Sequence, residues 1–145
     1  MNIILTVSEG AARAILDGYQ TAELRRRIPV QLNPGDTVYL AHSGLIHGHC
    51  TFGGLNIPPE GGLLLTKWLQ HISHAANTSS TEARTYLSGA KQPCALLLRY
   101  PVPYSRPRKS PAATTRSYTY THDQPTRVHP ALANFLLYLN THKQQ

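Results

Sequence analysis

Residues 18–27, GYQTAELRRR, place three consecutive arginines and one of the chain's seven acidic residues in a single short stretch. If the stretch is extended, successive side chains point to opposite faces. One face then carries Thr21, Glu23, Arg25 and Arg27. The opposite face carries Ala22 and Leu24. The carboxylate of Glu23 would lie between a hydroxyl and a guanidinium, where it can pair within the chain or accept hydrogen bonds from a ligand. The alternative is a charged strand that is simply solvated.

The residues before this stretch predict a buried strand followed by a short helix. Ile3 to Val7 is an apolar run rich in β-branched residues, which is typical of a buried strand. Ser8 is placed as the N-cap of a helix, with Glu9 in the first turn, where the helix dipole favours a negative charge. Gly18 is placed to end the helix as its C′ residue.

The residues after the stretch predict a tight turn and two more strands. Asn33-Pro34-Gly35-Asp36 is a strong turn signal. Thr37 to Ala41 and Leu45 to Phe52 then have the composition of β-strands. Gly48 interrupts the second of these strands and Gly53-Gly54 follows it, which indicates a bulge or a tight corner.

The middle of the chain predicts two helices and a further strand. Over Leu64 to Ala76, one helical stripe carries Leu65, Trp68, Leu69, Ile72 and Ala76. Ser80 to Leu87 has the pattern of a second, short helix closed by Gly89. Pro93 to Tyr100 is too short and too uniformly apolar for an amphipathic helix, so we expect a central strand there.

The composition changes sharply over residues 101–127, which are rich in Pro, Ser, Thr, Tyr and Arg. This composition predicts an extended or mobile arm, with an edge strand over Ser117 to Thr121 as an alternative. We therefore divide the chain into a domain core (residues 1–104), a basic arm or long loop (residues 105–127) and a C-terminal helix (residues 128–145). Apolar residues within Pro130 to Leu139 predict that this helix docks on the same domain.

Length and charge restrict the class of protein. A chain of 145 residues with 41% apolar residues is the size of one ordinary domain. Its 14 Lys and Arg residues against 7 Asp and Glu residues give a net charge of +7, which favours polyanionic partners such as nucleic acid. No apolar run approaches the roughly 20 residues that span a bilayer, and no signal-peptide pattern is present. With only two cysteines, no disulfide framework is indicated. We expect a cytoplasmic protein without a membrane partner.

Motifs in the first third of the chain resemble the ASCH domain family, which belongs to the PUA-like superfamily. GYQTAELR at residues 18–25 is similar to the family's Gly-x-Lys-Thr-x-Glu-x-Arg signature, and Pro34-Gly35-Asp36 and a strand containing Gly48 follow it. The match is specific over about residues 3–52 and agrees loosely in order and length to about Tyr104. The resemblance implies an α+β fold, a PUA-like small β-barrel with flanking helices, and a signature-lined cleft that recognises RNA or a nucleotide.

The same resemblance raises an enzyme as an alternative, because the family contains small acetylcytidine amidohydrolases and related members are reported as ribonucleases. In those amidohydrolases a signature lysine, a threonine three residues later and a distant glutamate form the catalytic set. This chain has Gln20 and Glu23 at the first two of these positions, and glutamine cannot titrate. We therefore expect recognition rather than turnover, with Glu23 as the base if the protein is an enzyme. We also expect the charge of Arg25 to lower the pKa of Glu23.

The histidines and cysteines do not indicate a metal site. His47 and His49 share a face if their strand is regular, but Cys50 then faces away. Cys50 and Cys94 lack a nearby basic pair or a Cys-x-x-Cys spacing, so we interpret both as buried, small apolar residues. We expect no metal ligands and no cofactor.

Together, the residues and the resemblance predict one ligand-binding cleft. Its predicted residues are Gln20, Thr21, Glu23, Arg25, Tyr39 and His42. Tyrosines and cations interleave in the arm, which is typical of segments that bind single-stranded nucleic acid. The predicted contacts to the RNA or single-stranded nucleic-acid backbone are Arg26, Arg27, Arg106, Arg108, Lys109 and Arg116. Two alternatives stay open. One is a hydrolase of the same fold, acting as a modified-nucleoside amidohydrolase or a ribonuclease, and the other is an interaction protein whose basic arm binds an acidic partner.

Overall fold

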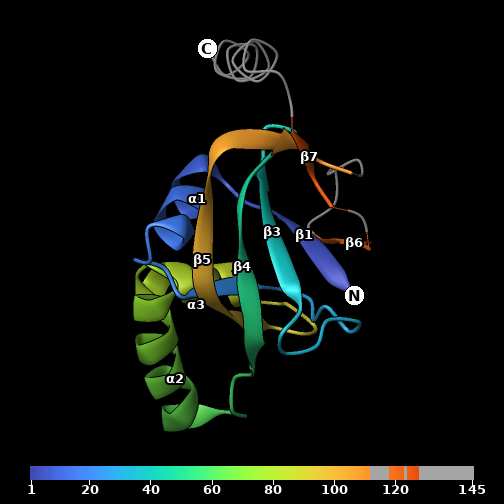
Figure 1. Cartoon of the computed structure of the whole chain (residues 1–145). Coiled ribbons are helices and arrows are strands. Elements are labelled where there is room, and N and C mark those ends of the chain that lie inside the picture. The colour runs from blue at the N-terminus through green and yellow to red at the C-terminus, as the bar shows by residue number, and fades with distance from the viewer. Residues whose placement is uncertain (112–117, 123, 128–145) are drawn as a thin grey trace.

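The computed structural model describes residues 1–111, 118–122 and 124–127. In chain order the elements are β1 (Asn2–Thr6), α1 (Glu9–Leu16), β2 (Ala22–Arg25), β3 (Thr37–His42), β4 (Leu45–Asn56), α2 (Gly62–Ala75), α3 (Ser80–Leu87), β5 (Cys94–Lys109), β6 (Tyr118–Thr121) and β7 (Thr126–Arg127). The strands form one curled sheet in the order β2-β5-β4-β3-β1-β6, and β7 pairs with the far end of β5. The helices α1, α2 and α3 lie along the side of the sheet on which β5 runs (Figure 1). This half-barrel with flanking helices confirms the predicted α+β class.

β1 lies inside the sheet, between β3 and β6. Its pairing with β3 is parallel and its pairing with β6 is antiparallel. Ile3 and Leu5 face the main apolar core, whereas Ile4 faces a smaller cluster on the opposite side of the sheet, and all three are fully buried. A strand that is covered on both faces requires such a continuous apolar run. The predicted buried strand is therefore confirmed.

α1 packs on the face of the sheet that carries the main core. Its Ala12 and Ile15 join residues of β1, β3, β4 and β5 in that core. The Ser8 hydroxyl accepts a hydrogen bond from the amide of Ala11 at 3.2 Å and so caps the helix. Gly18 has a φ of +85°, which lets the chain leave the helix and turn toward β2. Both predicted helix ends are confirmed.

The predicted turn and the glycine irregularities are present as well. The Asn33–Asp36 turn closes with the amide of Asp36 donating to the carbonyl of Asn33 at 3.0 Å. The pairing of β4 with β5 shifts register between Ile46 and Gly48, and again before Gly54. A Cβ at Gly48 would lie 2.6 Å from the carbonyl oxygen of Val102. Glycine therefore lets β4 and β5 approach closely at this bulge.

α2 and α3 form a second layer over β2 and the start of β5. The buried residues of this layer are Ala22, Leu24, Leu69, Ile72, Ala76, Ala83 and Ala95. Trp68 packs at the edge of the cluster and donates its indole N–H to Asn56 Oδ1 at 2.9 Å. The apolar stripe predicted for α2 therefore packs on a sheet face.

β5 continues well beyond the predicted strand. It runs to Lys109 and bends over the end of the sheet (Figure 1), so residues 105–109 of the predicted arm belong to the sheet. β6 confirms the alternative of an edge strand. Residues 112–117, 123 and 128–145, which include Arg116 and the predicted C-terminal helix, lie outside the described residues. In the described part of the chain, no helix combines the length and the apolar character needed to cross a bilayer.

Within the described residues, the two edges of the curled sheet do not pair with each other. β2 pairs with β5, and β6 pairs with β1. Side chains cross the gap between these edges, which we call the seam. Arg25 donates from Nη2 to the carbonyl of Thr6 at 2.8 Å, and the Tyr118 hydroxyl donates to the carbonyl of Arg27 at 2.8 Å. The side of β2 that faces the seam is therefore covered by side chains and not by another strand.

Candidate functional site

A cavity of about 410 Å³ lies beside the seam. Its walls come from the end of β1 with the start of α1, from β2, and from α3. Its polar and aromatic lining includes Thr6, Ser8, Glu23, Arg25, Glu82 and Tyr86. We call this cavity the Glu23 cleft. Its volume lies in the range of about 300–1,000 Å³ that is typical of small-molecule sites.

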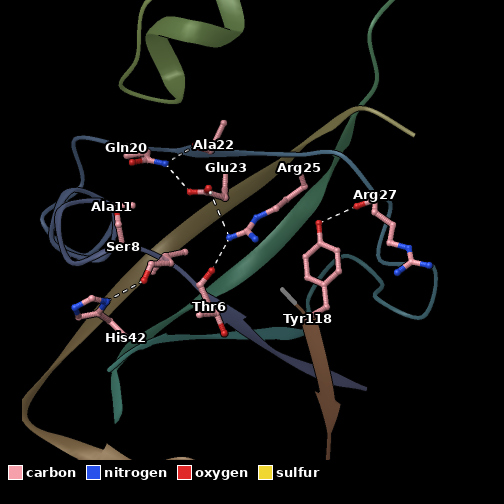
Figure 2. A network of polar contacts seen from close by, with 11 residues as sticks. Thr6, Ser8, Ala11, Gln20, Ala22, Glu23, Arg25, Arg27, His42 and Tyr118 are labelled. Carbon is pink, nitrogen blue, oxygen red and sulfur yellow. Dashed lines mark hydrogen bonds and ion pairs between the residues drawn. The ribbon is translucent and has the colours of Figure 1, made fainter. Parts of the chain in front are cut away.

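Glu23 and Arg25 lie side by side on the wall of the cleft. The side-chain amide of Gln20 donates to Glu23 Oε2 at 2.8 Å, and Arg25 Nη2 lies 3.7 Å from Glu23 Oε1 (Figure 2). The side chains of Glu23 and Arg25 are only 16% and 11% exposed. The pair is therefore shielded from bulk water although it borders a cavity. The prediction that these two side chains share one face of an extended segment is confirmed.

Arg25 connects β2 with the strands on the far side of the seam. Its Nη2 donates to the Thr6 carbonyl of β1, and its guanidinium carbon lies 5.7 Å from the centre of the Tyr118 ring of β6. Its Nε is buried without a hydrogen-bond partner in the described part of the chain. A buried donor without an acceptor costs free energy, so the guanidinium has hydrogen-bonding capacity that the described residues do not use.

The pKa of Glu23 is raised, whereas we expected Arg25 to lower it. Burial removes water from the carboxylate and has the largest influence on its pKa. The charge of Arg25 and the hydrogen bond from Gln20 act in the opposite direction, but their effects are smaller. The expectation from sequence was wrong because it considered the neighbouring charge and not the burial, which depends on helices that pack around β2.

Glu23→Gln is expected to change how stability depends on pH. The folded-state pKa of Glu23 lies above its ordinary value of 4.5, so the folded state holds this proton more tightly than the unfolded chain does. The resulting stabilisation is complete below about pH 4.5 and is lost as the pH rises through the folded-state pKa. Relative to wild type, the free energy of unfolding of Glu23→Gln should therefore rise as the pH is raised from about 4.5 through the folded-state pKa of Glu23.

Urea unfolding followed by the fluorescence of Trp68, the single tryptophan of the chain, measures this difference. Glu60→Gln, at an exposed carboxylate, is the control, and its difference from wild type should stay flat over the same range. A difference for Glu23→Gln that falls as the pH rises would contradict the raised pKa.

Gln20 and Thr21 line a neighbouring cavity and not the Glu23 cleft. Gln20 is buried, and its amide donates to the carbonyl of Ala22 at 3.0 Å as well as to Glu23. Gln20 therefore connects the two cavities. Thr21 is exposed, so its hydroxyl is not part of the shielded pair of Glu23 and Arg25.

Tyr39 lies on the far side of the sheet from the main core, so its assignment to the cleft is wrong. Side chains alternate along β3, and because Val38 and Leu40 point into the main core with α1, Tyr39 points to the opposite face. His42, at the end of β3, lies beside the cleft without lining it. Its Nδ1 is 3.2 Å from the carbonyl oxygen of Val7, which does line the cleft.

The face that carries Tyr39 holds a polar network that sequence reasoning missed. The hydroxyl of Tyr104 lies 2.7 Å from Nδ1 of His49, and Arg108 stacks over the Tyr104 ring at 4.0 Å. Tyr39 donates its hydroxyl to Gln124 Oε1 at 2.7 Å. Burial, together with the charge of Arg108, lowers the pKa of His49. These residues come from distant segments, so no local sequence pattern could have grouped them.

The predicted phosphate contacts fall into two groups at different places. Arg26 and Arg27 directly follow β2, whose last residue, Arg25, lines the Glu23 cleft. Arg106, Arg108 and Lys109 lie at the bent end of β5, where β7 pairs with it. Arg26 is already engaged at the C-terminal end of α3, since its Nη1 donates to the carbonyl of the C-cap residue Ser88 at 3.0 Å. Arg27 is exposed.

Three lining residues of the cleft, Ser8, Glu82 and Tyr86, were not predicted as site residues. Ser8 was identified only as a helix cap. Glu82 and Tyr86 are four residues apart and share a face of α3, and Glu82 accepts a hydrogen bond from the Thr78 hydroxyl at 2.7 Å. This spacing marks a common face, but only the packing of α3 shows that the face borders β2.

The cysteines are buried, as predicted. Burial raises the pKa of Cys50 to about 12 and that of Cys94 to about 11, so neither thiol is a nucleophile near neutral pH. The two histidines of β4 have different partners, since Nε2 of His47 lies 3.1 Å from the carbonyl of His42 while His49 contacts Tyr104. The described residues contain no group of three or more candidate metal ligands.

The fold is similar to that of solved ASCH proteins from Zymomonas mobilis. ASCH from Zymomonas mobilis aligns with a TM-score of 0.69 at 19% sequence identity, covering 95% of this chain and 94% of that chain. A ZmASCH mutant with tyrosine replaced by phenylalanine has a TM-score of 0.68 at 20% identity, covering 83% of this chain and 90% of its own. A mutant with serine replaced by alanine has a TM-score of 0.68 at 19% identity, with 95% of each chain covered. No protein-family model and no curated protein matches the sequence.

The protein therefore has the α+β fold of ASCH proteins. The resemblance predicted from GYQTAELR at residues 18–25 is confirmed at the level of the fold. At about one identical residue in five, the likeness to these structures extends to the fold and not to an activity.

Proposed function

We propose that the protein binds single-stranded RNA or a nucleotide, with a base in the Glu23 cleft. The observation that carries this proposal is the position of Glu23 and Arg25, an acceptor and a donor that lie side by side, shielded from bulk water, on the wall of a cavity of about 410 Å³. A nucleobase presents donors and acceptors together on one edge, and proteins read unpaired bases by such hydrogen bonds.

Both side chains keep unused hydrogen-bonding capacity. An ionised carboxylate has about four acceptor positions, and Glu23 accepts one hydrogen bond from Gln20 and lies near Arg25. Arg25 uses Nη2 for the Thr6 carbonyl, while its Nε has no partner among the described residues. A site with buried polar groups rejects ligands that leave these groups unpaired. The pair therefore favours selective recognition of a base edge.

The cleft has an aromatic ring in its lining, and a cation follows Arg25 two positions along the chain. Tyr86 of α3 lines the cleft and is 43% exposed, so its ring is available to stack on a base. Arg27 is exposed just after β2, and the hydrogen bond from Tyr118 to its carbonyl holds this part of the loop. We assign base stacking to Tyr86 and a phosphate contact to Arg27.

Salt-titrated binding of a fluorescein-labelled single-stranded RNA tests the proposal. We expect Glu23→Gln to weaken binding about 10-fold at low salt, because a good pair of hydrogen bonds to a base edge is worth about 1–3 kcal/mol of discrimination. We expect Arg27→Ala to reduce the slope of log K against log salt by about 0.7, the value for one phosphate of a single strand. Glu60→Gln, at an exposed carboxylate, is the matched control and should bind like wild type.

Two results would count against the proposal. If neither RNA nor single-stranded DNA binds at low salt, the function is wrong, and an acidic protein partner becomes the better explanation of the basic surface. If Glu23→Gln binds RNA as tightly as wild type, the protein binds nucleic acid at a place other than the Glu23 cleft.

One observation favours a hydrolase of the same fold as a second candidate. The raised pKa of Glu23 lets this carboxyl group keep its proton at higher pH than an ordinary glutamic acid does, and perturbed carboxyl groups of this kind are candidates for a general acid or base. Gln20 contacts Glu23 but cannot titrate, so Glu23 itself would move the proton. Incubation with N4-acetylcytidine and with labelled RNA tests this candidate. Turnover that disappears in Glu23→Gln supports it, and absence of turnover of both compounds contradicts it.

A further inference from the structure

A second cavity, of about 400 Å³, opens beside the start of β2. We call it the Tyr100 pocket. Its apolar lining includes Ile15, Leu97 and Pro101, and its polar lining consists of Gln20, Thr21 and Arg99 together with Tyr100. A mainly apolar cavity of this size with a few polar groups is typical of a small-molecule site. The main function proposed for the Glu23 cleft does not use it.

Tyr100 has a backbone conformation that tyrosine rarely adopts. Its φ of +53° lies in the left-handed region, which is unfavourable for a bulky side chain. The residue is 74% exposed, so burial of the ring does not offset this strain. Strained residues of this kind cluster at ligand sites. An exposed aromatic ring at a cavity is also suited to stack on a planar ligand.

Arg99 adds a positive charge to the same pocket. Its side chain lies close against Gly53 of β4, because a Cβ at Gly53 would be 2.6 Å from Arg99 Nε and 3.0 Å from its Cδ. Glycine at this position therefore lets the Arg99 side chain lie on the strand. Within residues 1–111, 118–122 and 124–127, Arg99 has no ion-pair partner. Its charge is therefore available to a phosphate group.

We propose that the Tyr100 pocket is a second base-binding subsite, which takes the nucleotide next to the one in the Glu23 cleft; this inference rests on the proposed function. Gln20 lies between the two cavities, since it lines the Tyr100 pocket and donates to Glu23. Thr21 lines the Tyr100 pocket and Glu23 lines the Glu23 cleft. The two residues are about 7 Å apart along an extended strand. Neighbouring bases of a single strand can be splayed apart onto separate protein surfaces.

The test compares an RNA of about eight nucleotides, a length within the site sizes of small single-strand-binding domains, with the four nucleoside monophosphates. Binding is measured for wild type, Tyr100→Gly and Tyr100→Phe. Glycine adopts a positive φ without strain, so Tyr100→Gly removes the ring and keeps the backbone, whereas Tyr100→Phe keeps the ring. We expect Tyr100→Gly to weaken RNA binding about 10-fold and to leave binding of the monophosphate in the Glu23 cleft unchanged. Tyr100→Phe should bind like wild type.

Gly53→Ala gives a second, independent variant, because the added methyl group displaces Arg99 and leaves Tyr100 in place. It should reduce the salt slope of RNA binding by about 0.7. Thermal unfolding of each variant verifies that the fold is intact.

The outcomes separate the subsite from the function on which it rests. If Tyr100→Gly and Gly53→Ala bind RNA like wild type while Glu23→Gln binds it more weakly, the subsite is wrong and the proposed function stands. If wild type binds no RNA at low salt, both fail. Equal weakening of RNA and monophosphate binding by Tyr100→Gly also overturns the subsite, because the ring would then act on the Glu23 cleft itself.

Discussion

Arg25→Ala is expected to lower the free energy of unfolding by about 3 kcal/mol. The substitution removes the charge beside Glu23 and the hydrogen bond to the Thr6 carbonyl. Glu23 then stays buried with Gln20 as its remaining polar contact among the described residues. Removing one member of a buried pair costs more than the pair contributes, because an unpaired charge is left in surroundings of low dielectric constant. The loss should become smaller at low pH, where Glu23 is protonated.

Urea unfolding followed by Trp68 fluorescence measures the loss. Arg27→Ala makes the same change of charge two positions away at an exposed site and should change the free energy of unfolding by less than about 0.5 kcal/mol. Arg25→Lys keeps the charge but loses the planar fork of donors, so it should fall between the two. If Arg25→Ala and Arg27→Ala prove equally stable, Arg25 does not hold the seam.

Gly48→Ala is expected to destabilise the protein by about 2 kcal/mol. A Cβ at this position would lie 2.5 Å from Leu16 Cδ2 and 2.6 Å from the carbonyl oxygen of Val102. The end of the Leu16 side chain can move, but the carbonyl of Val102 belongs to the backbone of β5. β4 and β5 therefore have to separate at the bulge.

Gly10→Ala is the matched control, and its expected effect has the opposite sign. Gly10 is an exposed residue of α1, and nothing lies within 4 Å of a Cβ built there. Alanine favours the helix, so this variant should be more stable than wild type by up to about 1 kcal/mol. Chemical denaturation of the two variants side by side checks both signs, and a Gly48→Ala protein as stable as wild type would show that the bulge adapts without cost.

Local patterns were sufficient to predict most of the elements. The apolar run of β1, the Ser8 cap, Gly18 and the stripe of α2 depend on residues within one or two turns of each other, and the structure confirms all of them. The alternation along β2 also placed Glu23 and Arg25 correctly. The strand signal of β5 was lost after Tyr100, because Pro and basic residues dominate the composition there although the backbone remains paired with β4.

The cleft as a whole could not be predicted, because its walls come from segments that meet only in the folded chain. Tyr39 was assigned to the cleft, but the alternation of β3 places it on the other face. Glu82 and Tyr86 border the cleft because α3 packs beside β2. The pKa of Glu23 was predicted in the wrong direction for the same reason, since burial is a property of the whole fold.

Among the described residues, the two edges of the half-barrel are joined across the seam by side-chain contacts and not by a ladder of backbone hydrogen bonds. Arg25 and Tyr118 make these side-chain contacts, and Arg25 also lines the Glu23 cleft. A ligand that binds Arg25 in the cleft would hold this side chain in place across the seam, so ligand binding and the separation of the two sheet edges would be coupled. Amide hydrogen exchange in Ala22–Arg25 should then slow when a ligand occupies the cleft. The exchange rate of this short strand would therefore report ligand binding.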